Sequence, residues 1–491
     1  MGHPHTITEY RLASVRRLVS GLILAGLTAT AGCAVGPNYR APSPTALKTP
    51  ARFNAVLPPS AQAAPDPVRW WRGFSDPVLT QLIDRALRAN LDIDVAGSRL
   101  RQARASLAVA RSAQLPTLDF GGAAARTIGQ GGGDATRFQA GFDAAYEVDV
   151  FGGVRRSVEA GRADSQAALA RLHTVQLSVV AEVAVNYIAA TLAQARLQIA
   201  RDNLAAQEET LQIVGWRVQA GLVSALDLEQ ARQLRAQTAA SIPTIESDYV
   251  AAVNRLAVLA GEAPGAVTAL IRTSPSIPEA PAGMSAPIPL DVIQRRPDVA
   301  AAERGLAAET ARIGVQAAQL YPALRLAGSF GGSGASLRQL ADSSIGNVIA
   351  NLTAPLYEGG RIRAAVRGQR AAAAAALATY RQTVLIALEE VENGLTAVSA
   401  ADRRAVQISL SEAAARNAAS YARRQYQTGL IDFRALLDAE RSLLSTQDAS
   451  ATTKATRATA TVQLYKALGG GWQAGPEPAS VTTSTFTLRP G

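Results

Sequence analysis

The sequence predicts a mixed α and β fold in which one structural unit occurs twice in tandem. Four pairs of matching segments follow one another in the same order at an offset of about 207 residues, and chance does not supply four such pairs. Residues 136–150 alternate between apolar and polar side chains, and proline is absent from residues 117–242 and 356–475. Alternation indicates a strand, and long stretches without proline permit long helices. Each unit is therefore expected to combine a β-hairpin with very long helices.

Residues 1–32 are expected to be an export signal that is removed from the mature protein. Basic side chains (Arg11, Arg16 and Arg17) precede an apolar run at residues 18–27 and the small residues 28–32. This order is typical of a secretory signal. The apolar run is too short for a membrane span, which needs about 20 residues.

Cys33 is the only cysteine in the chain and directly follows Gly32. A lone cysteine cannot form an intrachain disulfide. The site resembles the lipobox of bacterial lipoproteins, although Thr30 stands where a leucine is usual. We therefore expect residues 33–75 to be a lipidated, extended N-terminal segment, and Ala34 favours sorting to the outer membrane. Ordinary signal cleavage near Ala31, with an inert cysteine, is the alternative.

The first repeat is expected at residues 76–263. Asp76 and Pro77 predict a helix start, with the helix continuing to about Gln114. A β-hairpin follows, with one strand from near Leu118 and a second over residues 136–150. The next helix is expected to run from Val154 to about Val218 and to turn back at Gly221 as a helical hairpin.

The second repeat is expected at residues 291–472, after a Pro-rich linker at 264–290 and before a flexible tail at 473–491. Its strands are predicted near Ala323–Phe330 and Asn347–Tyr357. The matching long helix is expected to turn back at Gly429.

Composition argues against nucleic-acid binding and against enzymatic activity. The net charge is +10, but the arginines are scattered and no basic block is interleaved with aromatic side chains. His173 is the only histidine outside the signal, and it is expected to be a surface residue. Histidine-based metal sites and serine triads therefore lack parts, so we expect neither an enzyme nor a cofactor.

The strand at residues 136–150 suits a membrane barrel with lipid on one side and water on the other. A soluble, half-buried sheet is the alternative. Four strands cannot close a membrane barrel, because the smallest have about eight. If the strands span a membrane, the chain must oligomerise, and two copies or three would both suffice.

Eight segments together resemble the outer-membrane efflux protein family, the TolC-like outer-membrane factors, and in particular its lipoprotein (NodT-type) branch. They are "CAVGPNYRAP", "WWRGFSDPVLTQLIDRAL", "YEVDVFGGVRR", "RRPDVAAAE", "YPALRLAGSFG", "APLYEGGRI", "GLIDFRALLDAERSLL" and "LYKALGGGW". The resemblance implies a homotrimer with a twelve-stranded transmembrane β-barrel, continued by a long periplasmic α-helical barrel.

The same resemblance implies the function and the partners. The protein would be lipid-anchored in the outer membrane and would passively conduct substrates delivered by a periplasmic adaptor protein and an inner-membrane transporter, most often of the RND type. Small-molecule efflux is favoured, and metal efflux remains open. The exit duct of a type I protein secretion system and, from another class, a periplasmic coiled-coil scaffold without a barrel are the alternatives.

The resemblance also assigns site residues at the periplasmic end. Asp438 falls on the position of an acidic ring, and Asp227 and Tyr426 fall on positions that form closing contacts between helices. Alternatively, Asp227 and Asp438 are ordinary solvated carboxylates. The expected adaptor-docking turns contain Gly221, Leu222, Gly429 and Leu430.

Overall fold

The computed structural model divides the chain into two compact units, and each unit takes segments from both repeats. The sheet unit contains the N-terminal residues up to Ser43 together with Ser98–Leu169 and Ala300–Gln382. The hairpin unit contains Pro44–Gly97, Ala170–Val299 and Thr383–Gly491. The structure describes residues 34–43, 45–47, 49–55, 66, 68–128, 135–273, 276–281 and 289–472. The expected signal at 1–32, Cys33 and the tail at 473–491 lie outside the described residues.

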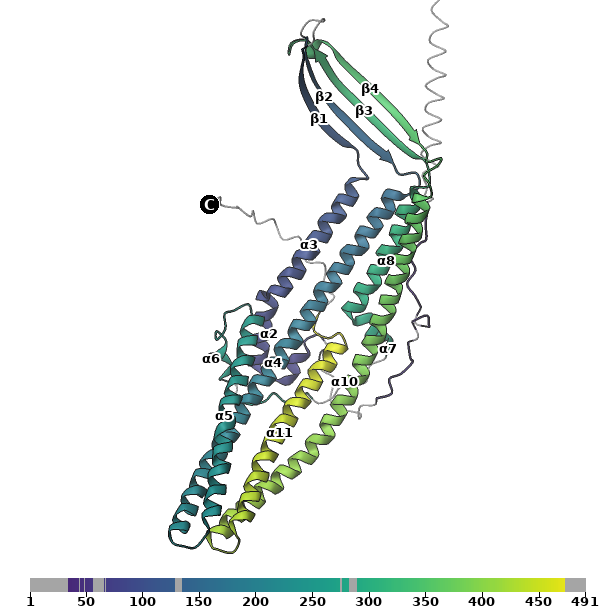
Figure 1. Cartoon of the computed structure of the whole chain (residues 1–491). Helices are drawn as coiled ribbons and strands as arrows, with labels where there is room; N and C mark the ends of the chain where they lie inside the picture. Colours follow the sequence, from purple (N-terminus) through teal and green to yellow (C-terminus); the bar gives the residue numbers. More distant parts are fainter. Residues whose placement is uncertain are drawn as a thin grey trace, which may run out of the picture. The chain divides into compact units, whose positions relative to one another are not determined.

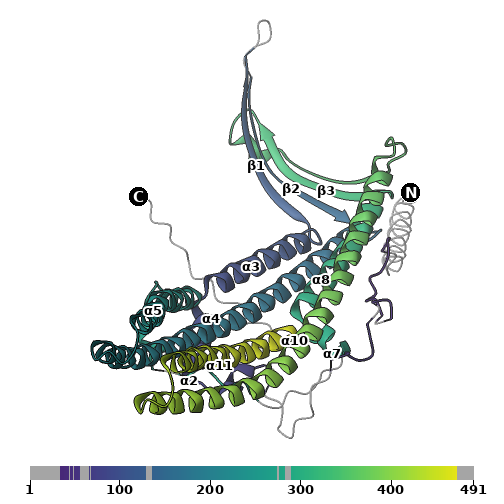
Figure 2. The ribbon, with the colours of Figure 1, turned by 60° about the horizontal axis from the view of Figure 1, so that its bottom comes forward.

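The sheet unit is built around one antiparallel sheet of four strands in sequence order (Figure 1). The strands are β1 (Thr117–Thr127), β2 (Ala135–Val148), β3 (Ala323–Gly334) and β4 (Ser344–Thr353). Residue Phe142 of β2 lies opposite both Phe120 of β1 and Phe330 of β3. The sheet is curved (Figure 2), and β1 and β4 are its two outer strands.

The two faces of the sheet differ in chemistry, as the alternation predicted. One face carries exposed aromatic side chains, with Phe120 67% and Phe330 60% exposed. On the other face, Arg325 donates to Glu147 across the β2–β3 pair at 3.2 Å. Large apolar side chains on one face that are exposed among the described residues, and charged side chains on the other face, are the pattern of a strand between lipid and water.

The second hairpin differs from its prediction at both ends. Strand β3 continues beyond Phe330 to Gly334, because residues 331–334 remain paired with β2. Strand β4 ends at Thr353 and not at Tyr357. Pro355 explains the earlier end, because proline has no N–H to donate to a sheet.

The predicted single helix from Pro77 to Gln114 was wrong, since the chain forms α2 (Pro77–Ala89) and α3 (Leu91–Ser112). Asn90 is extended, with φ −68° and ψ 128°, and its side-chain oxygen accepts the N–H groups of Asp92 and Ile93. Its amide also donates to the Leu259 carbonyl at 2.9 Å. A buried asparagine thus caps α3 and ends α2, which periodicity alone does not reveal.

Two long helices, α4 (Gly153–Gln219) and α10 (Arg361–Gln427), each contain 67 residues, or about 100 Å of helix. Both could cross a membrane by length and composition, in windows with mean hydropathy 1.5 and 1.3. This is weak evidence, because core helices pass the same criterion, and 56% of the α4 window is buried inside the protein. A bilayer core about 30 Å thick would hold only a fraction of either helix.

Each long helix turns back into a shorter one, α5 (Ala225–Leu259) after α4 and α11 (Phe433–Ala467) after α10. Helix α5 continues through Pro243. The remaining elements are η1 (Trp70–Phe74), α6 (Thr268–Ile271), α7 (Pro289–Arg295), α8 (Pro297–Ala318) and α9 (Gln339–Asp342). The expected repeat of helix, β-hairpin and helical hairpin is thus present twice.

The hairpin unit has an aromatic core. Trp70 is fully buried and stacks on Tyr465 with ring centroids 5.4 Å apart. Tyr187 is also fully buried, and its hydroxyl donates to Asp76 Oδ2 at 2.7 Å. His173 is not the simple surface residue that was expected. It is half-buried and stacks on the Trp472 ring at 4.5 Å, and burial lowers the pKa of its imidazole.

Candidate functional site

The two helical-hairpin turns have the same main-chain geometry. Gly221 and Gly429 have φ values of 72° and 78°, in the left-handed region that glycine adopts without strain. The N–H of Leu222 donates to the Arg217 carbonyl, and the N–H of Leu430 donates to the Gln425 carbonyl, both at 2.8 Å. Each glycine with its following leucine forms a Schellman ending of the long helix. The matching "GL" pairs therefore define the turns themselves.

The turns lie side by side at one end of the hairpin unit (Figures 1 and 2). Leu222 is 73% exposed and Leu430 is 75% exposed, while a Cβ built on Gly221 or Gly429 would meet no atom within 4 Å. The structure thus presents two exposed leucines on adjacent turns.

Asp227 lies in the first turn of α5 and completes a capping box with Ser224. Its Oδ2 accepts the Ser224 N–H at 3.0 Å and the Ser224 hydroxyl at 2.8 Å, and the Asp227 N–H donates to Ser224 Oγ at 3.2 Å. Such reciprocal bonds satisfy N–H groups that a helix start leaves without partners. Asp227 therefore has a structural role within its own chain.

Tyr426 is buried, with 2% of its surface exposed, in a cluster that includes Val214 and Phe433. Arg217 lies over the face of its ring, 4.4 Å from the centroid, and donates to the carbonyls of Tyr426 and Gln427, both at 2.9 Å. The Tyr426 hydroxyl makes no hydrogen bond within the described part of the chain. Burial raises the pKa of this hydroxyl, and the nearby Arg217 cation opposes the increase.

Asp227 and Tyr426 lie in the same region of the hairpin unit. The Asp227 carboxylate adds to the increase of the Tyr426 pKa through its charge. Among the described residues, the two side chains share no hydrogen bond. One chain therefore places both residues near the turns.

Asp438 lies on an exposed position of α11, directly after the buried Leu437. The structure records no ion pair for it within the described residues. It is available to solvent or to another chain.

Sequence reasoning missed Glu440, which is buried with 2% of its surface exposed. Its Oε1 accepts from Arg423 Nε at 3.0 Å and from Thr210 Oγ1 at 3.2 Å. These contacts connect α11 with α10 and α4. A signal was present, because Glu440 continues the buried stripe of Phe433, Leu436, Leu437 and Leu443 at helical spacing.

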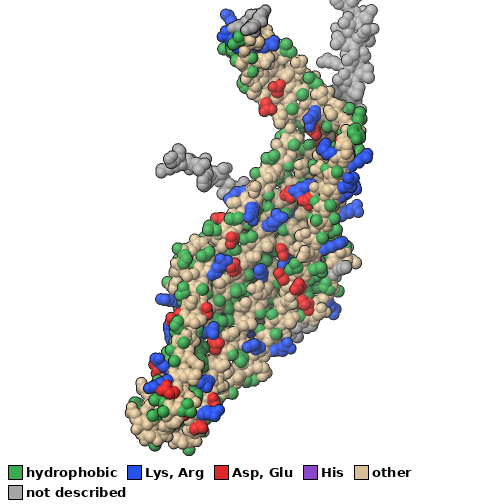
Figure 3. Space-filling view, viewed as in Figure 1, with side chains coloured by type: hydrophobic (Ala, Val, Ile, Leu, Met, Phe, Trp, Pro, Cys, Tyr) green, Lys and Arg blue, Asp and Glu red, His purple; other side chains and the backbone are tan. Residues whose placement is uncertain are grey.

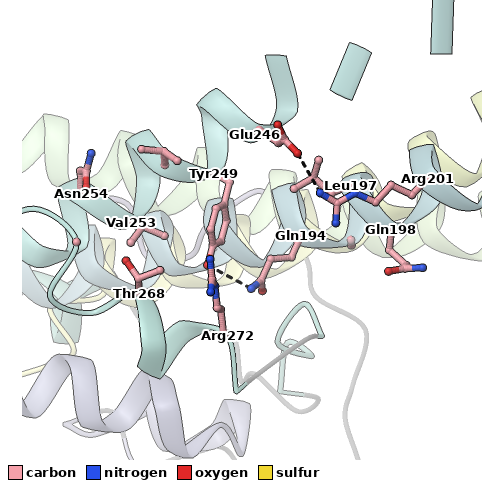
Figure 4. Close-up of a pocket in the computed structure, with 13 residues that line it drawn as sticks. Gln194, Leu197, Gln198, Arg201, Glu246, Tyr249, Val253, Asn254, Thr268 and Arg272 are labelled. Atoms are coloured by element: carbon pink, nitrogen blue, oxygen red, sulfur yellow. Dashed lines mark hydrogen bonds and ion pairs between the residues drawn. The ribbon is translucent and has the colours of Figure 1, made fainter. Parts of the chain in front are cut away.

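A half-open pocket of about 750 Å³ lies between α4, α5 and α6 of the hairpin unit (Figure 4). Tyr249 accepts from Gln194 at 3.4 Å, and Arg201 pairs with Glu246 at 2.9 Å. The buried Gln194 Oε1 has no hydrogen-bond partner among the described residues, and none of the site residues expected from the sequence lines the pocket.

Basic and acidic side chains both occur along the helices in Figure 3. Over the described residues, no group of three or more His, Cys, Asp or Glu side chains could hold a metal ion. The arrangement near the turns offers exposed leucines, an exposed carboxylate and a buried tyrosine, which suit contacts between chains more than chemistry on a substrate.

The family model described as "Outer membrane efflux protein" matches residues 82–262 and 288–470. The chain is 34% identical to the pyoverdine export outer membrane protein OpmQ of Pseudomonas putida, over 88% of this chain and 94% of the relative. It is 33% identical to nodulation protein T of Rhizobium leguminosarum bv. viciae, over 91% of this chain and 92% of the relative.

Its fold is similar to that of the solved outer-membrane channel OprN, with a TM-score of 0.81 and 36% identity. The match covers 90% of this chain and 100% of that chain. The sheet and the helical hairpins occur together in a channel of this kind, which favours a channel over a scaffold without strands. The chain therefore belongs to the outer membrane efflux protein family, with relatives in its NodT-type branch, and it is the outer-membrane channel of an efflux pump and not an enzyme.

Proposed function

We propose that three copies of the chain close a twelve-stranded barrel, which the long helices continue into the periplasm. The observation that carries this proposal is the open four-stranded sheet, whose outer strands β1 and β4 pair on one side only. Lipid cannot satisfy the free N–H and C=O groups of a strand edge, so these edges need another chain. Native mass spectrometry in detergent is expected to show three chains. A monomer that stays soluble without detergent would refute the proposal.

The mature N-terminus is a diacylated Cys33, which anchors the protein in the outer membrane. The support is the sequence around Cys33, because a lone cysteine after a signal and a glycine has few other uses. Two acyl chains give stable anchoring, at about 0.8 kcal/mol per buried methylene. Mass spectrometry of the mature N-terminus is expected to find the lipid, and an unmodified terminus would contradict the assignment.

Asp438, present three times around the axis, governs ion passage at the periplasmic aperture. Its exposure supports this role, because three converging carboxylates favour cations. Asp438→Asn is expected to lower cation selectivity in planar-bilayer recordings. Asp432→Asn is the matched control, because it removes the same charge nearby while asparagine keeps the helix cap that Asp432 provides. Equal selectivity in wild type and Asp438→Asn would refute the role.

Asp227 and Tyr426 hold the aperture closed through contacts between helices. The buried Tyr426 hydroxyl has no hydrogen-bond partner among the described residues of its own chain, which supports such a contact. Asp227→Ala combined with Tyr426→Phe is expected to open the pore more often. Ser224→Ala is the control, since it breaks the same capping box and keeps the Asp227 charge. If the control opens the pore equally, a frayed helix start and not a lost contact is the cause.

The two hairpin turns dock a periplasmic adaptor, which links the channel to an inner-membrane transporter of the RND type. Leu222 and Leu430 support this assignment by their exposure on adjacent turns. Leu222→Asp with Leu430→Asp is expected to abolish adaptor cross-linking while leaving the trimer intact. Val250→Asp, at another exposed apolar position of α5, is the control and should leave cross-linking unchanged.

The cargo is a small molecule. The relatives named for a cargo include a pyoverdine export protein and a toluene efflux pump component, and both cargoes are small molecules. A strain that lacks the channel gene should accumulate small efflux substrates and secrete its proteins normally. Loss of protein secretion with normal efflux would favour a type I secretion duct instead.

A further inference from the structure

The first described residues, Ala34–Tyr39, lie against helices α4 and α8 within the sheet unit. We call this segment the N-terminal strap. The N–H of Val35 donates to the Phe151 carbonyl at 3.1 Å, which places the strap beside the loop that joins β2 to α4. The strap thus meets the protein where the strand face ends and the helices begin.

Arg156 of α4 holds the strap by hydrogen bonds. Its side chain is 4% exposed, and its guanidinium donates to Val35 O at 3.2 Å, to Gly36 O at 3.4 Å and to Asn38 Oδ1 at 2.6 Å. The fourth acceptor is Glu159, at 2.8 Å. Three of the four acceptors therefore come from the strap. A buried guanidinium needs partners for its donors, and the strap supplies most of them.

The strap approaches α8 so closely that neither side has room for a side chain. Gly36 has φ 92°, and a Cβ on it would lie 2.5 Å from Gly314 Cα. A Cβ on Gly314 would lie 2.8 Å from Val35 O and 2.7 Å from Arg156 Cγ. Real Cβ atoms do not make contacts this short, so the two glycines permit a main-chain to main-chain fit.

The other end of the strap is fixed by an aromatic side chain. The Tyr39 hydroxyl donates to Glu303 Oε1 at 2.7 Å, and Arg304 lies over the Tyr39 ring at 5.6 Å from its centroid. Tyr39 also packs on Ala163, Ala307 and Ala308. The strap is therefore held at both ends and along its main chain.

We propose that Arg156, Gly314 and the Phe151 carbonyl form a socket for the chain's own mature N-terminus, and that this socket sets where the N-terminal anchor enters the membrane. The proposal rests on the lipidation of Cys33 proposed above only in identifying the anchor as a lipid. Ala34 lies against Gly152 in the loop after β2, where a Cβ on Gly152 would be 2.7 Å from Ala34 Cα, and Cys33 is the preceding residue in the sequence. Without the strap, Arg156 would keep a buried charge with most of its donors unmatched, so strap and socket depend on each other.

Hydrogen exchange of the detergent-solubilised trimer, followed by mass spectrometry of the peptide that contains Val35, tests the socket. Gly314→Ala should raise the exchange rate of this peptide by about tenfold or more, as expected for overpacking a tight contact. Gly305→Ala is the matched control on the same helix, because a Cβ there meets no atom within 4 Å. Exchange as slow in Gly314→Ala as in wild type would overturn the proposal.

A second pair of variants changes a residue of the strap and leaves the sequence of the helices unaltered. Asn38→Ala removes the acceptor at 2.6 Å from Arg156 and should speed exchange at Val35, whereas Asn38→Asp keeps an acceptor and should preserve wild-type protection. If the two variants exchange alike, Arg156 does not hold the strap. Mass spectrometry of the N-terminus is recorded in parallel. An unmodified Cys33 with the expected exchange pattern would refute the lipid anchor and leave the socket standing.

Discussion

Glu440 provides a sharp test of how the helical hairpins are held together. Its side chain is 3% exposed, whereas that of Arg423, its ionic partner, is 36% exposed. Arg423→Met keeps most of the aliphatic packing and removes the cation that compensates a buried carboxylate. Breaking a fully buried pair costs about 3–5 kcal/mol, and solvent access to Arg423 lowers the expected cost to about 2 kcal/mol.

This cost should appear as faster hydrogen exchange in residues 433–443 of α11. A loss of about 2 kcal/mol corresponds to an increase of about 30-fold in local opening. The double variant Arg423→Met with Glu440→Leu should recover much of the loss, because it no longer buries a charge without a partner. Arg416→Met is the control on the same helix, since Arg416 is 63% exposed and its pair with Glu412 should contribute only about 0–0.5 kcal/mol.

Two results would refute the reasoning. One is wild-type exchange in Arg423→Met, which would show that water already compensates Glu440. The other is a double variant that loses as much as the sum of its single variants. In that case the two side chains would stabilise the helices independently and not as a pair.

Three further predictions concern the hairpin unit. Burial raises the pKa of Tyr465 to about 12, and its hydroxyl has no hydrogen-bond partner among the described residues. Tyr465→Phe should therefore leave the thermal midpoint unchanged or raise it, and a clear decrease would show an unseen partner. Burial lowers the pKa of His173, so its packing on Trp472 should be intact above pH about 6.5, the ordinary value, and weaken as the pH falls through the lowered pKa. The Trp472 fluorescence, taken as the difference from Trp472→Phe, should change on acidification and become insensitive to pH in His173→Phe. Asn90→Ala should destabilise the unit by about 1–2 kcal/mol, because it removes a helix cap and leaves the Leu259 carbonyl without its donor. Circular-dichroism melts that match the wild type would contradict this expectation.

The sequence by itself determined the elements whose periodicity is long and regular. The alternation at residues 136–150 is enough to identify β2, because a strand between lipid and water must change chemistry at every residue. The turns at Gly221 and Gly429 were equally readable, because a left-handed residue that ends a helix is usually glycine. The lack of proline allowed the long helix of the first repeat, expected from Val154 to about Val218, to be placed within one residue of both ends of α4 (Gly153–Gln219).

Only the tertiary structure decided the features that depend on partners distant in sequence. The break at Asn90 depends on the Leu259 carbonyl, and the burial of Glu440 depends on Arg423 and Thr210. His173 became a half-buried residue because Trp472 packs on it. In the sequence, Arg156 does not differ from the other helix arginines. The structure shows that the strap, more than a hundred residues earlier, supplies its hydrogen-bond acceptors. The local sequence pattern indicates which side chains require a hydrogen-bond or packing partner. The packing of segments distant in sequence decides which residue supplies that partner.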